Sequence, residues 1–356
     1  MSKRVLVAMS GGIDSSVAAI LLLEQGYDLV GVTFRTFDSI RESCLSREKG
    51  CCSVESIMEA KHLAEQLGFE HHILDYRNIF RETVIRNFVD EYMHGRTPNP
   101  CVLCNSHIKW GELMRAADEY GCDYIATGHY ARIAEHRGHL YLQNAVDKHK
   151  DQTYFLWMLT EENLSRTIFP LGGLTKPEVR EFAARHGFQT LAGKTESQEI
   201  CFVPNNDYRS FLAENGCRVE QGSFVDKEGK MLGIHQGFCN YTIGQRKGLG
   251  IALGEPRFVT HINAGTNEVT LGDRDDLLTT SVSASDVLIR DLDWLHEDPL
   301  VQVRIRYRSS AVDARVESCD NRRVVLQTTE PVWAVTSGQS LVLYKDNLLI
   351  GGGIID

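Results

Sequence analysis

The chain has 356 residues, of which 42% are hydrophobic and 24% charged, enough for two or three domains that each bury a core. No uninterrupted run of about 18 apolar residues occurs, which argues against a membrane-spanning helix, and the short apolar run near the start lacks the cleavage region of a signal peptide. The formal net charge of −10 argues against nonspecific adhesion to nucleic acid but leaves room for a local basic surface.

Ten cysteines are spaced irregularly along the chain, unlike the framework of a secreted, disulfide-rich domain. We therefore expect a cytoplasmic protein whose thiols are reduced and are mostly small core residues. The adjacent Cys51 and Cys52 could relay sulfur, but incidental or buried thiols are the simpler interpretation.

The first half of the chain alternates apolar runs with stretches of helical periodicity. This alternation predicts an α/β fold with a doubly wound parallel sheet, which binds its ligands at the carboxyl ends of its strands. The segment 151–211 is also helical in pattern, and one helix should begin after Thr175, with Glu178 completing a capping box. We predict strands at 4–9, 29–34, 72–75 and 124–127, and helices at 15–24, 54–67, 80–93 and 108–120.

Beyond about residue 215 the pattern changes, because glycines multiply and short alternating runs indicate strands. These runs predict small antiparallel sheets or barrels, divided by a break around 278–285. We therefore predict an α/β domain at 1–207, a small central β-rich domain at 208–278 and a C-terminal β-barrel at 279–356. The runs lie at 258–262, 268–271, 301–307, 323–328 and 340–344.

The sequence Ser10-Gly-Gly-Ile-Asp-Ser-Ser16 joins a predicted strand to a predicted helix. Its glycines let the backbone approach an anion, and the start of the helix offers N–H groups to a phosphate. The hydroxyls of Ser10, Ser15 and Ser16 add donors, and Asp14 could hold Mg²⁺ carried by a nucleotide. The competing interpretation is an ordinary strand–helix turn in which Asp14 or Ser15 merely caps the helix.

Two further segments carry cysteines that could react. In 96–109 two prolines predict an extended approach, which places Cys104 at or near the start of the following helix, where the dipole stabilises a thiolate. The spacing of Cys101 and Cys104 also fits half of a zinc site, but only His107 lies near it. Cys201, between two large apolar residues, is by itself more typical of a core.

The glycine-rich loop resembles the PP-loop of ATP pyrophosphatases, which cleave ATP between the α- and β-phosphates. Blocks along nearly the whole chain then resemble, in order, the tRNA-specific 2-thiouridylases. The blocks are SGGIDSS (10–16), GRTPNPCVLCN (95–105), ATGHYAR (126–132), KDQTYFL (150–156), ESQEICFV (196–203), YTIGQRKGLG (241–250), IRYR (305–308) and GGGII (351–355).

The resemblance implies a transferase whose first domain uses ATP and Mg²⁺ to adenylate the C2 oxygen of the wobble uridine in the tRNAs for Lys, Glu and Gln. A persulfide on Cys201, charged by a cysteine desulfurase or a relay protein, supplies the sulfur. AMP leaves, and Cys104 acts as nucleophile and closes a transient Cys104–Cys201 disulfide. The implied ATP-binding residues are Ala8, Met9, Ser10, Gly11, Gly12, Ile13, Asp14, Ser15, Phe34 and Gly128. The implied tRNA-contacting residues are Asn99, Pro100, Cys101, His129, Lys150, Asp151, Gln152, Tyr307, Arg308 and Gln339.

One position departs from the family pattern, which has an aspartate where this chain has Cys101. That acid is assigned to the target base, so either another group handles the proton here or the role is smaller than assumed. Cys101, Cys104 and Cys201 could instead converge as the three thiolate ligands of an iron–sulfur cluster. The plainest interpretation is that Cys101 is a tolerated small residue.

Arg304, Arg306 and Arg308 alternate along a predicted strand, so their guanidinium groups should share one face and suit a phosphate backbone. An ordinary solvated strand face is the alternative. Two other functions remain open: a different PP-loop ligase that acts on a small carboxylate or amide, and a noncatalytic redox or metal-binding module built on the cysteines. Cleavage of ATP excludes the module, and dependence on tRNA excludes the small-molecule ligase.

Overall fold

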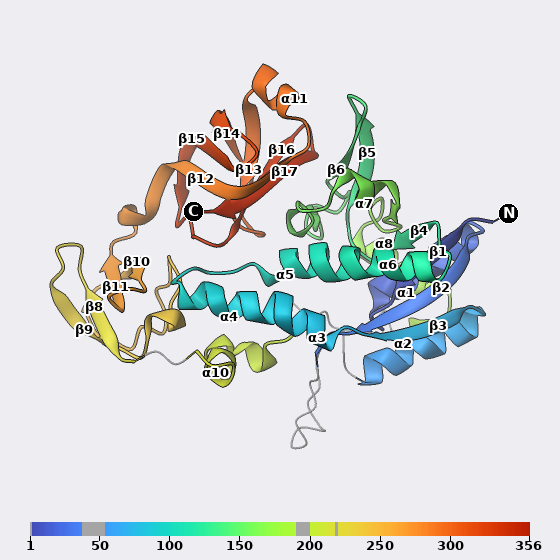
Figure 1. Cartoon of the computed structure of the whole chain (residues 1–356), viewed down its shortest axis with the longest axis horizontal. Helices are drawn as coiled ribbons and strands as arrows, with labels where there is room; N and C mark the ends of the chain where they lie inside the picture. Colours follow the sequence, from blue (N-terminus) through green and yellow to red (C-terminus); the bar gives the residue numbers. More distant parts are fainter. Residues whose placement is uncertain (1, 38–53, 190–199, 218–219) are drawn as a thin grey trace. The chain divides into compact units, whose positions relative to one another are not determined.

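A computed structural model describes residues 2–37, 54–189, 200–217 and 220–356 (Figure 1). The chain divides into two compact units. The first comprises Met1–Val84, Cys101–Asn206 and Asn347–Leu349, and the second comprises Ile85–Pro100, Asp207–Asp346 and Ile350–Asp356. The adjacent Cys51 and Cys52 and part of the block before Cys201 lie outside the described residues.

The first unit is built on a parallel sheet, as predicted. Its strand order is β3-β2-β1-β4-β7, and β1 occupies the middle with Val5, Leu6 and Val7 fully buried. Val5 and Val7 pack with α1 and α2 on one face, so alternation turns Leu6 to the other face. The strands are β1 Arg4–Ala8, β2 Asp28–Arg35, β3 Glu70–Asp75, β4 Tyr124–Ala126 and β7 Thr167–Ile168, and the two helices are α1 Ile13–Glu24 and α2 Val54–Leu67.

The remaining helices partly follow the predictions. The helix α8, Lys176–Arg185, begins after Thr175, whose backbone N–H and hydroxyl both donate to Glu178 Oε2 at 2.6 and 2.7 Å, which confirms the capping box. The helix predicted at 108–120 begins earlier, at Pro100. It runs through α5 Pro100–Leu103, a π-helical segment Cys104–Glu112 and α6 Leu113–Glu119.

Other segments of the first unit are short. The predicted helix 80–93 is divided into α3 Arg77–Phe80, a π-helical segment Arg81–Ile85 and α4 Arg86–Met93, of which α4 belongs to the second unit. The segment expected to be helical from 151 to 211 also includes strand β7. Among the described residues its helices are the 3₁₀ turn Thr153–Phe155, α7 Glu161–Ser165, α8, the 3₁₀ turn Pro204–Asn206 and α10 Tyr208–Glu214, of which α10 belongs to the second unit. A hairpin of β5 Arg132–His136 and β6 His139–Gln143 precedes them.

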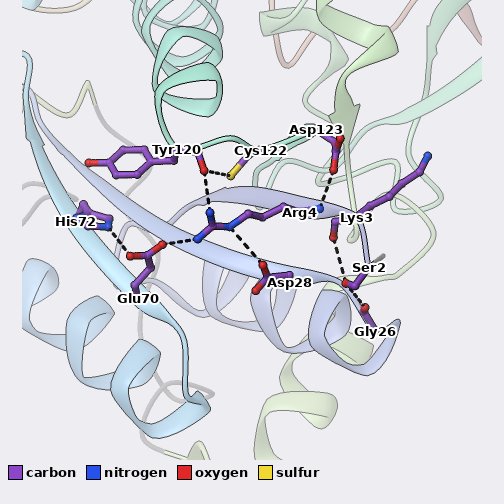
Figure 2. A network of polar contacts seen from close by, with 10 residues as sticks. All are labelled: Ser2, Lys3, Arg4, Gly26, Asp28, Glu70, His72, Tyr120, Cys122 and Asp123. Carbon is purple, nitrogen blue, oxygen red and sulfur yellow. Dashed lines mark hydrogen bonds and ion pairs between the residues drawn. The ribbon is translucent and has the colours of Figure 1, made fainter.

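The amino ends of the sheet strands are joined by Arg4 (Figure 2). Its guanidinium donates to the carbonyl of Tyr120 at 3.0 Å and to Glu70 Oε1 at 2.5 Å, and it lies 3.3 Å from Asp28 Oδ2. Its backbone N–H donates to Asp123 Oδ2 at 2.9 Å. One side chain therefore ties together the starts of β1, β2 and β3 and the segment that leads into β4.

The second unit contains two β structures. The smaller is a four-stranded sheet in the order β10-β11-β8-β9, in which β11 and β8 are parallel and the other pairs antiparallel. The turn between β8 and β9 has Gly229 at φ +82°, which favours glycine. The strands are β8 Gly222–Val225, β9 Met231–His235, β10 Phe258–Asn263 and β11 Glu268–Gly272.

The larger β structure is a closed six-stranded barrel, as predicted for the C-terminal region. Its order is β12-β15-β14-β13-β16-β17, and β12 also pairs with β17. The strand β12 occupies the segment 278–285, where the division of the β-rich region was predicted, and the barrel begins with it. A register shift between Thr279 and Ser281 lets this long strand bend without ending. The strands are β12 Leu278–Ile289, β13 Leu300–Arg304, β14 Val312–Cys319, β15 Arg323–Trp333, β16 Ser340–Lys345 and β17 Leu348–Ile355, and α11 Leu292–Glu297 lies between β12 and β13.

Among the residues that the structure describes, no helix has the length and apolar character needed to cross a membrane.

Candidate active site

The predicted phosphate loop lies between β1 and α1. Gly12 is the N-cap of α1, with φ −90° and ψ 160°, and no side chain caps the helix. Instead, the hydroxyls of Ser15 and Ser16 donate to the carbonyl of Gly12 at 3.1 and 3.0 Å, and Ser15 Oγ accepts from the N–H of Ser10 at 3.1 Å. The serines thus fix the shape of the loop, while the first N–H groups of α1 stay uncapped by side chains, as an anion site requires.

Two glycines let other segments approach this loop closely. Gly11 has φ +68°, and a Cβ there would lie 2.2 Å from the carbonyl oxygen of Ser56 in α2. A Cβ at Gly128 would lie 2.8 Å from both the carbonyl carbon of Asp14 and the N of Ser15. The structure therefore brings Gly128, at the end of β4, directly against the start of α1, as expected for residues that share one nucleotide site.

A lysine that the sequence reasoning missed completes the loop. Lys176, the first residue of α8, is 6% exposed, and its Nζ donates to the two carboxylate oxygens of Asp14 at 2.7 and 2.9 Å. Tyr130 donates its hydroxyl to the same carboxylate at 2.8 Å. A lysine in the first turn of a helix is unfavourable because of the helix dipole. This unusual position, visible in the sequence, is the signal by which Lys176 could have been found.

This arrangement changes the role expected of Asp14. Its carboxylate is already engaged by an ammonium and a phenol, so the residues present do not form an open Mg²⁺ ligand. The same contacts hold a positive charge beside the uncapped start of α1, where a departing pyrophosphate needs one.

A second set of polar contacts connects the loop to β2 and β3. Thr33 Oγ1 donates to the carbonyl of Met9 at 2.7 Å and lies 2.9 Å from His71 Nε2, so Nε2 carries the proton and donates to Thr33. His71 Nδ1 is buried and has no hydrogen-bond partner among the described residues. Burial, and then the charge of neighbouring His72, lower the pKa of His71 to about 4.

Phe34, which the resemblance places beside the base of ATP, follows Thr33 and lies near the carboxyl end of β2. Its ring packs edge-on against Tyr76, with centroids 5.1 Å apart. Phe34 therefore lies at the carboxyl end of a strand adjacent to β1, where the fold class predicts the nucleotide.

Cys104 does not lie at a helix start. Because the helix begins at Pro100, Cys104 is one turn inside it, and the dipole effect is concentrated in the first turn. Its stabilisation as a thiolate by the dipole stays a prediction, and Cys104 lies further from the helix start than the predicted extended approach implied. The physical reason is that proline suits the first position of a helix, so the second proline starts the helix instead of extending the approach.

Cys201 is exposed and is held by its neighbour. Phe202 is 2% exposed and packs edge-on against Phe80 of α3, with centroids 5.6 Å apart. The segment next to α3 contacts the helix of Cys104, because the hydroxyl of Tyr76 lies 3.5 Å from the carbonyl of Glu112. Both cysteines thus lie in the first unit: the Cys201 segment packs on α3 through Phe202, and the residue before α3 contacts the helix of Cys104.

The iron–sulfur hypothesis finds no support. Among the described residues, which include Cys101, Cys104 and Cys201, no group of three His, Cys, Asp or Glu side chains is placed to hold a metal ion. Three thiolates around a cluster would have to converge within a few ångströms, and these three do not form such a group.

His129, expected to contact tRNA, is 9% exposed. Its Nδ1 lies 2.7 Å from Thr127 Oγ1 and its Nε2 lies 3.4 Å from Lys109 Nζ. Burial, and then the charge of Lys109, hold the pKa of His129 well below its usual value. His129 is therefore neutral, and Nε2 accepts from the lysine.

The predicted tRNA segment Lys150–Gln152 is anchored by its middle residue. Asp151 is 3% exposed, and its carboxylate accepts from the N–H of Ala145 at 2.6 Å and from the hydroxyl of Thr153 at 2.6 Å. Gln152 Oε1 accepts from the N–H of Tyr130 at 2.9 Å. These contacts support a positioning role for Asp151 and leave Lys150, which is half-buried, as the cation that the loop presents.

A second group of predicted tRNA residues lies in the second unit. Gln339 Nε2 donates to the carbonyls of Thr97 and Pro98 at 3.0 and 2.9 Å, and Asn99 Nδ2 lies 3.5 Å from Ser340 Oγ. Asn99, Pro100 and Gln339, separated by about 240 positions, therefore lie together. Only Tyr307 and Arg308 of the predicted second-unit contacts lie elsewhere, in the turn after β13.

The three arginines predicted to share a strand face do not. The strand β13 ends at Arg304, and the chain turns at 305–308. Arg304 lies over the ring of Tyr344 at 5.3 Å, whereas Arg306 donates to the carbonyl of Ala334 and, at 3.0 Å, to Thr336 Oγ1. The hydrogen bond from Arg306 to this backbone carbonyl is made from the turn and not from a continued strand. The alternation of residues in the sequence does not reveal that contact.

Three other cysteines have raised pKa values and are therefore poor nucleophiles at neutral pH. Burial raises the pKa of Cys122 to about 11, that of Cys319 to about 11 and that of Cys239 to about 12. Cys239 Sγ lies 3.1 Å from Cys217 Sγ, and both are buried.

Family models match nearly the whole chain. The model described as tRNA methyl transferase HUP domain matches residues 3–205, the tRNA methyl transferase PRC-barrel domain 209–273, and the aminomethyltransferase beta-barrel domain 284–355. The fold and the loop thus define an ATP-using α/β enzyme of the PP-loop type, joined to a small β domain and a β-barrel.

Curated relatives give the particular family. A tRNA-specific 2-thiouridylase MnmA of Cytophaga hutchinsonii is 46% identical over 365 residues, covering 100% of this chain and 98% of the relative. Another, of Amoebophilus asiaticus, is 47% identical over 357 residues, covering 99% and 95%. The chain belongs to the tRNA-specific 2-thiouridylase family and is an ATP-dependent tRNA sulfurtransferase. A solved 4-thiouridine synthetase–RNA complex with bound ATP is 20% identical over 60% of this chain and 50% of that one, with a TM-score of 0.39, a likeness too weak to carry an inference.

Proposed function

We propose that this enzyme thiolates C2 of the wobble uridine in the tRNAs for Lys, Glu and Gln. The observation that carries the proposal is the uncapped start of α1, bordered by Gly11 and Gly128 and by the buried ammonium of Lys176. This is a site for the pyrophosphate end of ATP, and the sulfur chemistry of the family needs that activation. Mg²⁺ enters bound to the phosphates of ATP, since Asp14 is already paired.

Adenylation comes first. The C2 oxygen of uridine attacks the α-phosphorus of ATP, the bond from that phosphorus to the bridging oxygen breaks, and pyrophosphate leaves along the loop. Residues Ala8–Ser15, Phe34 and Gly128 hold the nucleotide in this proposal. Lys176 and the N–H groups of α1 stabilise the charge that develops on the leaving group.

Sulfur transfer follows. A cysteine desulfurase or a relay protein charges Cys201 as a persulfide, and its terminal sulfur forms a bond to C2 as AMP leaves. The thiolate of Cys104 attacks Sγ of Cys201, the persulfide S–S bond breaks with its electron pair going to the transferred sulfur, and a Cys104–Cys201 disulfide forms. An external thiol must reduce that disulfide before the next turnover, which suits a cytoplasmic location.

The tRNA is held in this proposal by residues of both units. His129, Lys150, Gln152 and the chain around Cys101 contribute from the first unit, with Asp151 positioning its loop. Asn99, Pro100, Tyr307, Arg308 and Gln339 contribute from the second. The corresponding domains are proposed at 1–207, 208–278 and 279–356.

The test supplies purified protein with ATP, Mg²⁺, a persulfide donor, a thiol reductant and an unmodified tRNA, and measures 2-thiouridine by mass spectrometry of the digested RNA. Cys104→Ser and Cys201→Ser should abolish the product, whereas Cys319→Ser, in the barrel, should not. Full activity of Cys201→Ser would overturn the persulfide assignment. Release of pyrophosphate that does not depend on tRNA would favour a ligase that acts on a small molecule.

A further inference from the structure

The second unit contains a cavity that the proposed reaction does not use. Its volume is about 470 Å³, within the range of small-molecule sites. Five separate segments line it, and the side chains that matter below are Arg209, Arg306, Trp333 and Gln339. All its described lining residues lie in the second unit, whereas the phosphate loop, Cys104 and Cys201 lie in the first.

The cavity is positively charged in an acidic protein. Two arginines line it, and none of the described lining residues is acidic, although the chain carries a net charge of −10. Arg209 donates through Nε to the carbonyl of Asn240 at 3.1 Å and lies over the ring of Tyr241 at 5.6 Å. No carboxylate among the described residues lies within ion-pair distance of Arg209, so its charge is available to an anionic ligand.

An aromatic wall faces these charges. Trp333 contacts Gly244, where a Cβ would lie 3.1 Å from the indole ring, and Arg306, which lies over the ring at 5.5 Å, and both of these residues also line the cavity. The next residue, Ala334, has φ +53°, a conformation that L-residues adopt rarely and that often marks a binding site. The fold therefore accepts backbone strain where it presents this indole.

Among the described lining residues, two polar groups can give specificity: the buried Nε1 of Trp333, which has no hydrogen-bond partner there, and the amide oxygen of Gln339. Gln339 uses Nε2 to hold Thr97 and Pro98, which leaves Oε1 as the acceptor that it can offer to a ligand. A flat ring that stacks on Trp333, donates to an amide oxygen and carries a nearby anion matches a nucleotide.

We propose that this cavity binds one unpaired nucleotide of the RNA substrate, other than the uridine that reacts. The base stacks on Trp333 and donates to Gln339 Oε1, and its phosphate pairs with Arg209. The inference rests on the proposed function for the identity of the RNA, but the cavity itself is independent of the thiolation chemistry. It gives the enzyme a second point of attachment to an RNA loop.

The experiment measures binding of a fluorescein-labelled anticodon stem-loop to the full-length protein by anisotropy at several salt concentrations. Arg209→Gln should weaken binding and reduce the slope of log K against log salt by about 0.7, the value for one phosphate contact on a single strand. Trp333→Leu should weaken binding about tenfold and leave the slope unchanged, because stacking carries no counterion term. Arg322→Gln, a charge change in the turn before β15 and outside the cavity lining, is the matched control and should alter neither value.

Unchanged affinity in both Arg209→Gln and Trp333→Leu, with native circular dichroism, would overturn the proposal. Uridine monophosphate is added as a competitor: displacement of the stem-loop at equal concentration would assign the cavity to free nucleotides instead. With saturating tRNA, Arg209→Gln should retain the single-turnover thiolation rate. Wild-type protein that shows these binding effects but makes no 2-thiouridine would sink the proposed function and leave the cavity assignment standing.

Discussion

The two ends of the parallel sheet are built in opposite ways. At the amino ends, Arg4 contacts the starts of neighbouring segments through partly exposed ion pairs and hydrogen bonds (Figure 2). At the carboxyl ends, α1 starts without a side-chain cap, and the buried ammonium of Lys176 pairs with the partly exposed carboxylate of Asp14. The contacts at the amino ends connect strands to one another, whereas the polar groups at the carboxyl ends are placed where a ligand can bind. Stability and chemistry should therefore respond separately to substitution at the two ends.

The largest expected effect is at the carboxyl ends. Lys176→Met removes the ammonium beside α1 and should lower tRNA-dependent pyrophosphate release at least about 100-fold. It should also lower the free energy of unfolding by about 2 kcal/mol, because the carboxylate of Asp14 loses its partner. Stopped assays of pyrophosphate and urea denaturation measure the two effects.

A double variant separates these two causes. Asp14→Asn combined with Lys176→Met removes both charges, so stability should recover while pyrophosphate release stays low. If activity recovers together with stability, Lys176 serves only to neutralise Asp14.

The next effect concerns the close approach of Gly128 to the loop. A methyl group there would lie 2.8 Å from the backbone of Asp14 and Ser15, and neither backbone can retreat without moving α1. Gly128→Ala should therefore raise the KM for ATP about tenfold, through a shifted phosphate site. Gly173→Ala is the control, because a Cβ at Gly173 meets no atom within 4 Å. Equal KM values for both variants would contradict a nucleotide site at this contact.

Substitution at the amino ends of the strands should lower stability and leave activity unchanged. Arg4→Gln leaves several acceptors without their donor and should lower the free energy of unfolding by about 1–2 kcal/mol, with kcat and the KM for ATP unchanged. Arg185→Gln, at the exposed end of α8, should stay within about 0.5 kcal/mol of wild type. A loss of kcat in folded Arg4→Gln would mean that the two ends are coupled.

The smallest effect is a pH dependence beneath the loop. The pKa of His71 falls from 6.5 to about 4 on folding, so the unfolded chain takes up a proton first as the pH drops. Stability should be full well above pH 6.5 and should fall as the pH approaches 4, by about 0.7 kcal/mol between pH 7 and pH 6. His71→Gln keeps a donor for Thr33 but cannot titrate, so its free energy of unfolding relative to that of wild type should rise by the same amount as the pH falls. A constant difference from pH 7 to pH 5 would contradict this.

Much of this architecture is visible in the sequence because it rests on local pattern. Apolar runs between stretches of helical periodicity predicted β1, β2, β3 and β4. The Thr175 capping box predicted the start of α8. The errors arise where two local rules compete. Pro100 obeys its preference for the first position of a helix, and this moves Cys104 inside the helix.

The rest depends on contacts between distant residues. Lys176 and Asp14 are 162 positions apart, and Arg306 binds the carbonyl of Ala334, 28 positions away. No periodicity encodes such pairs, since only the folded backbone brings them together. The resemblance to a family supplied roles for single residues, and the structure supplied the partners that make those roles physically specific.

The raised pKa values of Cys122, Cys239 and Cys319 have a consequence for chemical selectivity. An enzyme that transfers persulfide sulfur exposes every thiolate in its own chain to the same electrophile. With pKa values of about 11 for Cys122 and Cys319 and about 12 for Cys239, no more than about one in ten thousand of these thiols is ionised at neutral pH. These three of the ten cysteines are thus kept out of the sulfur route, because proton affinity, and not the absence of a thiol, decides whether such a bystander can react.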